Sequence, residues 1–233
     1  GNMKRVNGEY DKALDFYLRS LKIRTELQLP LEAAAVQEAI GRVYINLEKP
    51  ERAIGFYMQA KGVYESFKDS SRLVPLWSLI GDYHATRKDY ETGLSYYNQA
   101  LVVYNRWLAT KNFKLAEQQL KNFRANTITA CSFCLIETGR AKNAIALLEP
   151  MLEERRNIGG IAGFQELLFL GYAHLRAGDF KRSVIYSEAA LKQLNGIPML
   201  TLYDERGDLN RNLSEAYYGL GDYKHAYEYF KAF

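Results

Sequence analysis

Apolar and small residues recur along the chain in steps of three and four. In one stretch Ala53, Tyr57, Ala60, Tyr64 and Phe67 follow one another in such steps. Steps of this size place the side chains on one face of a helix with 3.6 residues per turn. We find no stretch with the strict alternation of apolar and polar residues that is typical of β-strands. The pattern therefore predicts an all-helical chain.

The helical pattern is repeated. Six small residues are equivalent and are separated by 40, 40, 51, 39 and 43 positions: Ala13, Ala53, Gly93, Ala144, Ser183 and Ala226. Each copy reads as two helices joined by a turn of glycine, an acidic residue and an aromatic residue, as in 8–10, 178–180 and 221–223. Glycine suits the left-handed residue that ends a helix, and the acid suits the start of the next. The chain is thus predicted to be an array of helix pairs.

This array resembles the tetratricopeptide repeat family over nearly the whole chain. The resemblance rests on Gly41, Tyr44, Ala53, Tyr57 and Ala60, and again on Trp77, Gly81, Tyr97 and Ala100. It implies a right-handed α-α superhelix, a single solenoid domain over residues 1–233 with about five full repeats, partial terminal repeats and roughly 11 helices. The period near 40 departs from the usual 34 or so, so we expect longer helices or longer connections. The copy around Ala144 is degenerate, with Ser132 and Leu135 where glycine and tyrosine are expected.

The longest insertion and the two ends carry further expectations. We predict a helix to about Leu108, a turn at 110–112, a long helix to about Glu137, and loops at 157–163 and 195–198. The first copy lacks most of its first helix, and the last copy stops inside its second helix. Because solenoids need capping elements, we expect a fragment of a longer protein.

Composition and charge exclude several classes. Apolar residues make up 48% of the chain and charged residues 25%, which is ordinary for a globular domain. No apolar run approaches the roughly 20 residues of a membrane span. A net charge of +4 is too small to indicate nucleic acid by itself. Cys131 and Cys134 are predicted to be reduced core residues, and the three histidines to be packing or surface residues. We predict no catalytic residues, no metal and no cofactor.

The segment from Arg106 to Arg124 is locally basic and contains aromatic residues. Nucleic-acid binding through Arg106, Lys111, Lys114, Lys121 and Arg124 is one alternative, and partner docking is another. The helical spacing instead favours Trp107, Phe113 and Phe123 as core residues beside a solvated charged face. Likewise, the spacing of Tyr17, Tyr57 and Tyr97 equals that of the repeat and predicts core packing.

The resemblance implies that the first helix of each pair lines a concave groove. Residues three before and one after the glycine equivalent, and then one turn on, should face it. The expected partner-binding residues are Glu38, Arg42, Ser78, Asp82, Thr129, Phe133, Leu168, Tyr172, Arg176, Arg211, Glu215 and Tyr218, with Asn46, Thr86 and Glu137 one turn on. An apolar strip flanked by arginines suits a peptide with aromatic contacts and a carboxylate. The alternative is that these are ordinary solenoid residues covered by neighbouring repeats.

The function that the resemblance implies is non-catalytic recognition of a protein or peptide. The Lys and Asn clamp of the family's chaperone-tail binders is not carried over, since Glu38, Arg42, Ser78 and Asp82 stand at the matching places. The copies near 40 residues and the final copy resemble the repeat regions of Bacteroidetes-type signalling regulators. We therefore expect a sensor or interaction region of a bacterial signalling or transcriptional regulator. The alternatives are a cytoplasmic peptide-pheromone-responsive regulator and a free-standing adaptor.

The compartment and the assembly state stay open at this point. A periplasmic sensor segment and a cytoplasmic protein are both compatible with two unpaired cysteines. A membrane would be reached only through flanking segments outside the chain, and the sequence leaves the oligomeric state undetermined.

Overall fold

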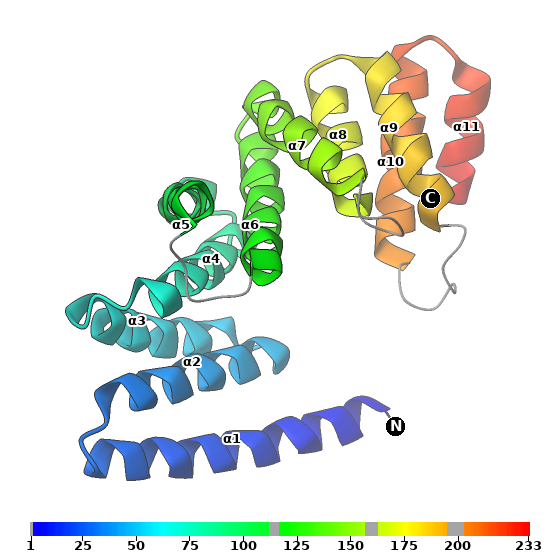
Figure 1. The fold of residues 1–233 in the computed structure, drawn as a ribbon. Coiled ribbons are helices and arrows are strands. Elements are labelled where there is room, and N and C mark those ends of the chain that lie inside the picture. Colours follow the sequence, from blue (N-terminus) through cyan, green and yellow to red (C-terminus); the bar gives the residue numbers. More distant parts are fainter. Residues whose placement is uncertain (1, 112–116, 157–162, 195–202) are drawn as a thin grey trace. The chain divides into compact units, whose positions relative to one another are not determined.

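The computed structural model describes residues 2–111, 117–156, 163–194 and 203–233, and every regular element in these ranges is an α-helix (Figure 1). The helices are α1 (Asn2–Glu26), α2 (Pro30–Asn46), α3 (Pro50–Ser66), α4 (Ser70–Thr86), α5 (Tyr90–Thr110), α6 (Glu117–Glu137), α7 (Ala141–Arg156), α8 (Phe164–Arg176), α9 (Phe180–Leu194), α10 (Tyr203–Gly219) and α11 (Tyr223–Ala232). The predicted fold class, an all-helical array, is confirmed.

The chain divides into two compact units, residues 1–124 and 125–233. In the first unit α1 packs on α2, α2 on α3, α3 on α4 and α4 on α5. In the second unit the contacts run from α7 through α8, α9 and α10 to α11. Each unit is therefore a stack of helices in chain order, and the single domain over 1–233 stays a prediction.

The 40-residue period comes from the length of the helices. Gln28, Glu48, Lys68 and Lys88 have positive φ and stand 20 residues apart. Between them lie α2, α3 and α4, each of 17 residues. Two such helices and two three-residue turns make 40 residues. The departure from the usual repeat length thus reflects longer helices. It does not reflect longer connections, because the turns have only three residues.

The turns share one hydrogen-bond pattern. Backbone N–H groups of Lys49, Asp89 and Asp179 donate to carbonyl oxygens five residues earlier, in each case at 2.9 Å. The left-handed residue that this motif needs is glycine in the second unit: Gly139, Gly178 and Gly221. In the first unit the same place holds residues other than glycine, so the predicted glycine signal marks only some of the turns.

The predicted turn at Gly8-Glu9-Tyr10 is wrong, because α1 runs through these residues without a break. A glycine inside a helix costs only about 1 kcal/mol relative to alanine, which neighbouring helical residues offset. Helix α5 continues to Thr110, two residues beyond the expected end, and α6 ends at Glu137 as predicted. Asn112, residues 157–162 of the loop predicted at 157–163, and the loop at 195–198 lie outside the described residues.

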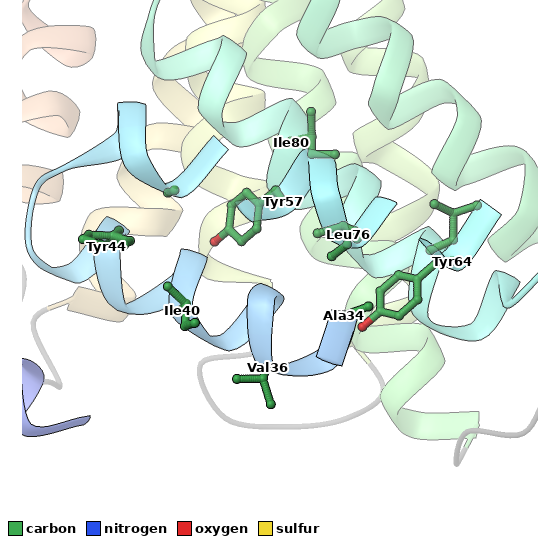
Figure 2. Close-up of a cluster of buried hydrophobic side chains, with 11 residues drawn as sticks. Ala34, Val36, Ile40, Tyr44, Tyr57, Tyr64, Leu76 and Ile80 are labelled. Atoms are coloured by element: carbon green, nitrogen blue, oxygen red, sulfur yellow. The ribbon is translucent and has the colours of Figure 1, made fainter. Parts of the chain in front are cut away.

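The core of the first unit forms where a tyrosine ring rests on a helix backbone. Tyr57 is 1% exposed and lies among the apolar side chains of α2, α3 and α4, with Ile40 on α2 and Ile80 on α4 (Figure 2). A Cβ atom at Gly41 would overlap the ring of Tyr57. Gly81 and Tyr97 repeat the arrangement one period later. Glycine is therefore needed here to let the two helices of a pair approach closely.

The tyrosine series is only partly a core feature. Tyr57 and Tyr97 are each 1% exposed, as predicted, but Tyr17 is 37% exposed. Tyr17 keeps this exposure although helix α1, which carries it, packs against α2. The core assignment of Tyr17 is therefore wrong.

We predict that Gly41→Ala lowers the free energy of unfolding by about 1–3 kcal/mol, because the new methyl group overpacks the Tyr57 ring. Gly62→Ala is the matched control, since a Cβ there meets open space on α3. The control should gain up to about 1 kcal/mol from higher helix propensity. Urea unfolding of both variants measures the difference, and equal effects would contradict the close-approach role of Gly41.

Candidate functional site

Two hollows, one within each unit, lie between first helices of successive pairs. The C-terminal hollow has a volume of about 180 Å³ and is lined by Phe133 and Glu137 of α6, Leu168, Phe169 and Tyr172 of α8, and Asp208, Arg211 and Asn212 of α10. The N-terminal hollow has a volume of about 320 Å³ and is lined by Arg42, Ile45 and Asn46 of α2, Tyr57 of α3, and Leu79, Asp82, Tyr83 and Thr86 of α4. Both are made mostly by the helices that the resemblance assigns to the groove.

The C-terminal hollow combines apolar side chains with a charged rim. Phe133, Leu168 and Phe169 are half-buried, and the two phenylalanine rings meet edge to face with centroids 6.2 Å apart. Glu137 and Arg211 are exposed. A small apolar hollow with a few polar groups at its edge is the usual form of a binding site. This arrangement can accept one apolar side chain of a ligand and bind the ligand's polar groups on either side of that side chain.

One wall of the C-terminal hollow is fixed by a hydrogen bond between helices. The Tyr172 hydroxyl of α8 donates to Oε1 of Glu137 on α6 at 2.6 Å. Burial, and then the bond to this carboxylate, raise the pKa of Tyr172 to about 12. The hydroxyl therefore stays protonated at neutral pH and remains a donor. The ring of Tyr172 is held in place before any ligand arrives.

Arg211 supplies the cationic group of this hollow. Its Nη2 atom lies 2.7 Å from Oδ1 of Asp208, three residues earlier on α10. Its guanidinium carbon also lies 6.0 Å from the centroid of the Phe233 ring. The positive charges of Arg211 and Arg176 partly oppose the rise in the pKa of Tyr172. Both arginines thus act electrostatically on the same hydroxyl.

The N-terminal hollow combines apolar side chains, Ile45 and Leu79, with the charged groups of Arg42 and Asp82. The Tyr97 hydroxyl donates to Oδ1 of Asp82 at 2.7 Å. Although Asp82 is exposed, the surrounding protein atoms reduce its solvation and raise the pKa of its carboxyl, and the Tyr97 bond partly offsets this effect. Arg42 lies 2.9 Å from Glu38, which also accepts a hydrogen bond from Tyr64. The charges here are largely engaged with one another.

The predicted groove residues divide into two groups. Six of the twelve line these hollows: Arg42, Asp82, Phe133, Leu168, Tyr172 and Arg211, as do Asn46, Thr86 and Glu137. The other six line neither: Glu38, Ser78, Thr129, Arg176, Glu215 and Tyr218. Thr129 is buried and donates to the carbonyl of Ala125, and Tyr218 packs edge to face on Tyr223 at the turn after α10.

Several lining residues were missed because the register shifts along the stack. Counted from the residue at the glycine place, which is Ser132 in α6 and Gly171 in α8, α6 contributes positions +1 and +5 and α8 contributes −3, −2 and +1. Counted from Ser214, helix α10 contributes −6, −3 and −2, which are Asp208, Arg211 and Asn212. The lining thus moves toward the N-terminal end of each successive first helix. A rule with one fixed register finds Arg211 but passes over Asp208, Asn212 and Phe169.

The remaining candidate groups have structural surroundings. Cys131 and Cys134 are buried, and burial raises the pKa of the Cys131 thiol to about 11. No group of three or more potential metal ligands occurs in the part of the chain that the structure describes. Among the described helices, none has the length and apolar character needed to cross a membrane.

The basic segment is only partly as expected. Trp107 is half-buried against a core cluster with Tyr104, as predicted. Phe123, however, is 37% exposed, so its assignment to the core is wrong. Nε of Arg124 donates to Asn105 at 2.7 Å, and Lys121 pairs with Glu117, also at 2.7 Å. Phe113 and Lys114 lie outside the described residues.

Comparison with known proteins supports the class that the sequence pattern predicts. Residues 34–67 match the family model of the tetratricopeptide repeat, which covers most of α2 and all of α3. The predicted resemblance to the tetratricopeptide repeat is thereby confirmed over this helix pair. No curated protein matches the chain significantly. The crystal structure of BtubC (BKLC) from P. vanneervenii is similar, with a TM-score of 0.70 over 96% of this chain and 89% of that one. At 15% identity, this likeness is one of fold.

The histidines at the helix ends pack against aromatic rings. His174 is 2% exposed and stacks on Tyr186 with ring centroids 5.3 Å apart. Its Nδ1 atom lies 3.5 Å from Oδ2 of Asp179, and neither ring nitrogen has a hydrogen-bond partner among the described residues. Burial lowers the pKa of His174, and the charge of Asp179 partly opposes this shift. The ring is therefore held in its neutral form.

We predict that His174 makes the protein less stable in mild acid. Since its pKa is lower in the folded chain, the unfolded chain takes up this proton first as the pH falls. The free energy of unfolding therefore decreases below about pH 6.5. His174→Phe should remove this contribution. Urea unfolding near pH 7.5 and pH 5 should show a smaller loss of stability in the variant than in the wild type, and equal losses would contradict the prediction.

Proposed function

We propose that this chain is a non-catalytic recognition domain that binds a protein or peptide, with the C-terminal hollow as the main anchoring site. Tetratricopeptide repeats are typically interaction modules without catalytic residues. The observation that carries the proposal is the convergence of Phe133, Leu168, Phe169 and Tyr172 from two first helices beside Arg211 from a third. A ligand segment that carries an apolar side chain next to a charged group matches this surface.

The hollow acts by being formed in advance. The Tyr172–Glu137 bond fixes one wall, so that a ligand meets an ordered surface and loses less free energy on binding. An apolar side chain of an extended segment inserts between Phe133, Leu168 and Phe169. Water is then excluded from the centre of the contact, where the largest contributions to affinity arise.

Arg211 provides the charged contact. Its pair with Asp208 is half-exposed on both sides, and exposed pairs of this kind contribute only about 0–1 kcal/mol. A carboxylate of the ligand can therefore share or replace Asp208 at small cost. A bidentate contact between guanidinium and carboxylate would also set the direction in which the segment lies.

We further propose that the domain is a sensor or interaction region of a bacterial signalling or transcriptional regulator. This finer assignment rests on the sequence resemblance, and the 40-residue period of two 17-residue helices and two short turns supports it. A pheromone-responsive regulator and a free-standing adaptor remain its alternatives. Reading the coding region on both sides of this segment distinguishes the three.

The anchoring role is tested with peptides selected from a random phage-displayed library against the chain. We predict that Leu168→Ser and Tyr172→Ala each weaken binding of the selected peptides by about tenfold or more, because each removes part of the wall of the hollow. Glu215→Ala is the control, since this exposed residue of α10 lies outside the hollow. Fluorescence anisotropy with labelled peptides measures the affinities.

The outcome that would overturn the proposal is equally specific. If peptides selected on the wild-type chain bind the Leu168 and Tyr172 variants with unchanged affinity, the C-terminal hollow does not anchor them. Unfolding curves of both variants show whether a loss of binding merely reflects a loss of fold.

A further inference from the structure

The N-terminal hollow lies inside the stack of the first unit. It is lined by α2 and α4, with Tyr57 of α3 between them, and has a volume of about 320 Å³. Because α1 packs on α2 and α5 packs on α4, the hollow belongs to the interior of this stack and not to an end of it. Its openness is therefore a property of the surface that these three helices form together.

One wall of the N-terminal hollow contains a buried hydroxyl group without a partner. Tyr57 is 1% exposed, and its ring belongs to the core cluster (Figure 2). Its hydroxyl makes no hydrogen bond with the described residues, whereas those of Tyr64 and Tyr97 donate to Glu38 and Asp82. Burial above all raises the pKa of Tyr57 to about 12, so the hydroxyl stays protonated. Since buried polar groups normally have a partner, this hydroxyl indicates a ligand.

Asp82 gives the hollow a negative charge that no cation of the described residues neutralises by an ion pair. Its Oδ1 atom accepts a hydrogen bond from Tyr97, which is a neutral donor. Nε and Nη2 of Arg42 both donate to Oε1 of Glu38, so this pair is neutral as a whole. The two carboxylates and the guanidinium all act on the Tyr57 hydroxyl and leave one negative charge in sum. Loss of solvation raises the pKa of Asp82, and a bound cation would offset this cost.

The charges farther from the hollow balance one another. Arg87, in the turn after Thr86, pairs with Glu51 at the start of α3. Arg52 lies over the ring of Tyr44, which is not part of the lining. The turns at 47–49 and 87–89, taken with Glu51, hold three cations and three anions, all exposed: Lys49, Arg87 and Lys88, and Glu48, Glu51 and Asp89. Exposed charges are screened by water and salt, so the carboxylate inside the hollow dominates.

The remaining lining suits the hydrocarbon stem of a cationic side chain. Ile45, which is 41% exposed, and the half-buried Leu79 provide apolar surface. Lysine buries its methylene groups along such surface and keeps its ammonium among polar groups. The Thr86 hydroxyl donates to a backbone carbonyl of α4 at 2.8 Å, so its lone pairs are left to accept. An ammonium group has three donors, which match the oxygen atoms of Asp82, Tyr57 and Thr86.

We propose that the N-terminal hollow binds a lysine side chain of a partner protein, with its ammonium group between Asp82 and Tyr57. The stem lies against Ile45 and Leu79. That the lysine belongs to a protein segment rests on the proposed function, but the site is a second one, separate from the C-terminal hollow. A small diamine fits less well, because the hollow has one uncompensated carboxylate and its second ammonium would be repelled by Arg42.

The experiment uses two synthetic peptides that differ in one charge. Acetyl-Ala-Ala-Lys-Ala-Ala-amide is titrated into the full chain, and the methyl NMR signals of Ile45 and Leu79 are followed. The matched peptide has norleucine, which keeps the stem and lacks the ammonium group, in place of lysine. We expect saturable shifts with the lysine peptide and affinity about tenfold lower or more with the norleucine peptide, because only the ammonium meets the carboxylate.

Substitutions in the chain assign the contact. Asp82→Asn keeps the shape of the side chain and should weaken the lysine peptide about tenfold or more. Tyr57→Phe keeps the buried ring and should weaken it about threefold or more. The free energy of unfolding of Tyr57→Phe should not fall, since this hydroxyl has no partner within the chain to lose. Glu215→Gln removes an exposed carboxylate of α10 outside both hollows and is the control, with unchanged affinity.

Three results would overturn the proposal. The first is the same response to the lysine and norleucine peptides, or no saturable shift with either. The second is unchanged affinity in Asp82→Asn. The third is tighter binding of 1,5-diaminopentane than of the lysine peptide, because the occupant would then be a small amine. Peptides bound by the C-terminal hollow depend instead on Leu168 and Tyr172, so each of the two sites can fail without the other.

Discussion

The close approach of the two helices within a pair is the constraint on which the rest of the structure depends. At Gly41 and Gly81 the absence of a side chain lets a tyrosine ring of the second helix rest on the backbone of the first. At Gly171 the small side chain of Ser187 takes the place of the ring. Since each pair buries its apolar face only against its neighbours, a change at one contact affects the stacking on both sides.

These packing tyrosines also shape the surfaces of the two hollows. The buried ring of Tyr97 ends in a hydroxyl that holds Asp82, and Tyr64 in the same way reaches Glu38. In the second unit Tyr172 holds Glu137. Core and site are therefore connected by single side chains, and the carboxylates of the hollows are positioned by residues whose rings pack between helices.

Sequence reasoning succeeded where one residue type has one physical role. Small residues at fixed spacing located the helix pairs, and Gly178 and Gly221 marked turns because glycine adopts positive φ without strain. It failed at Gly8, where a helix tolerated the glycine, and at Lys68 and Lys88, where other residues adopt positive φ. Local propensity is weak, and tertiary packing decides such positions.

The sequence by itself determined the repeat, the helical class and the helices that carry the candidate site, because periodicity follows from the geometry of a single helix. Only the tertiary structure decided which residues of those helices meet. Asp208 joins Arg211 in the C-terminal hollow while Tyr218 packs on Tyr223, since the lining shifts along successive first helices. That shift depends on how neighbouring helices pack against one another, which one helix's periodicity does not contain.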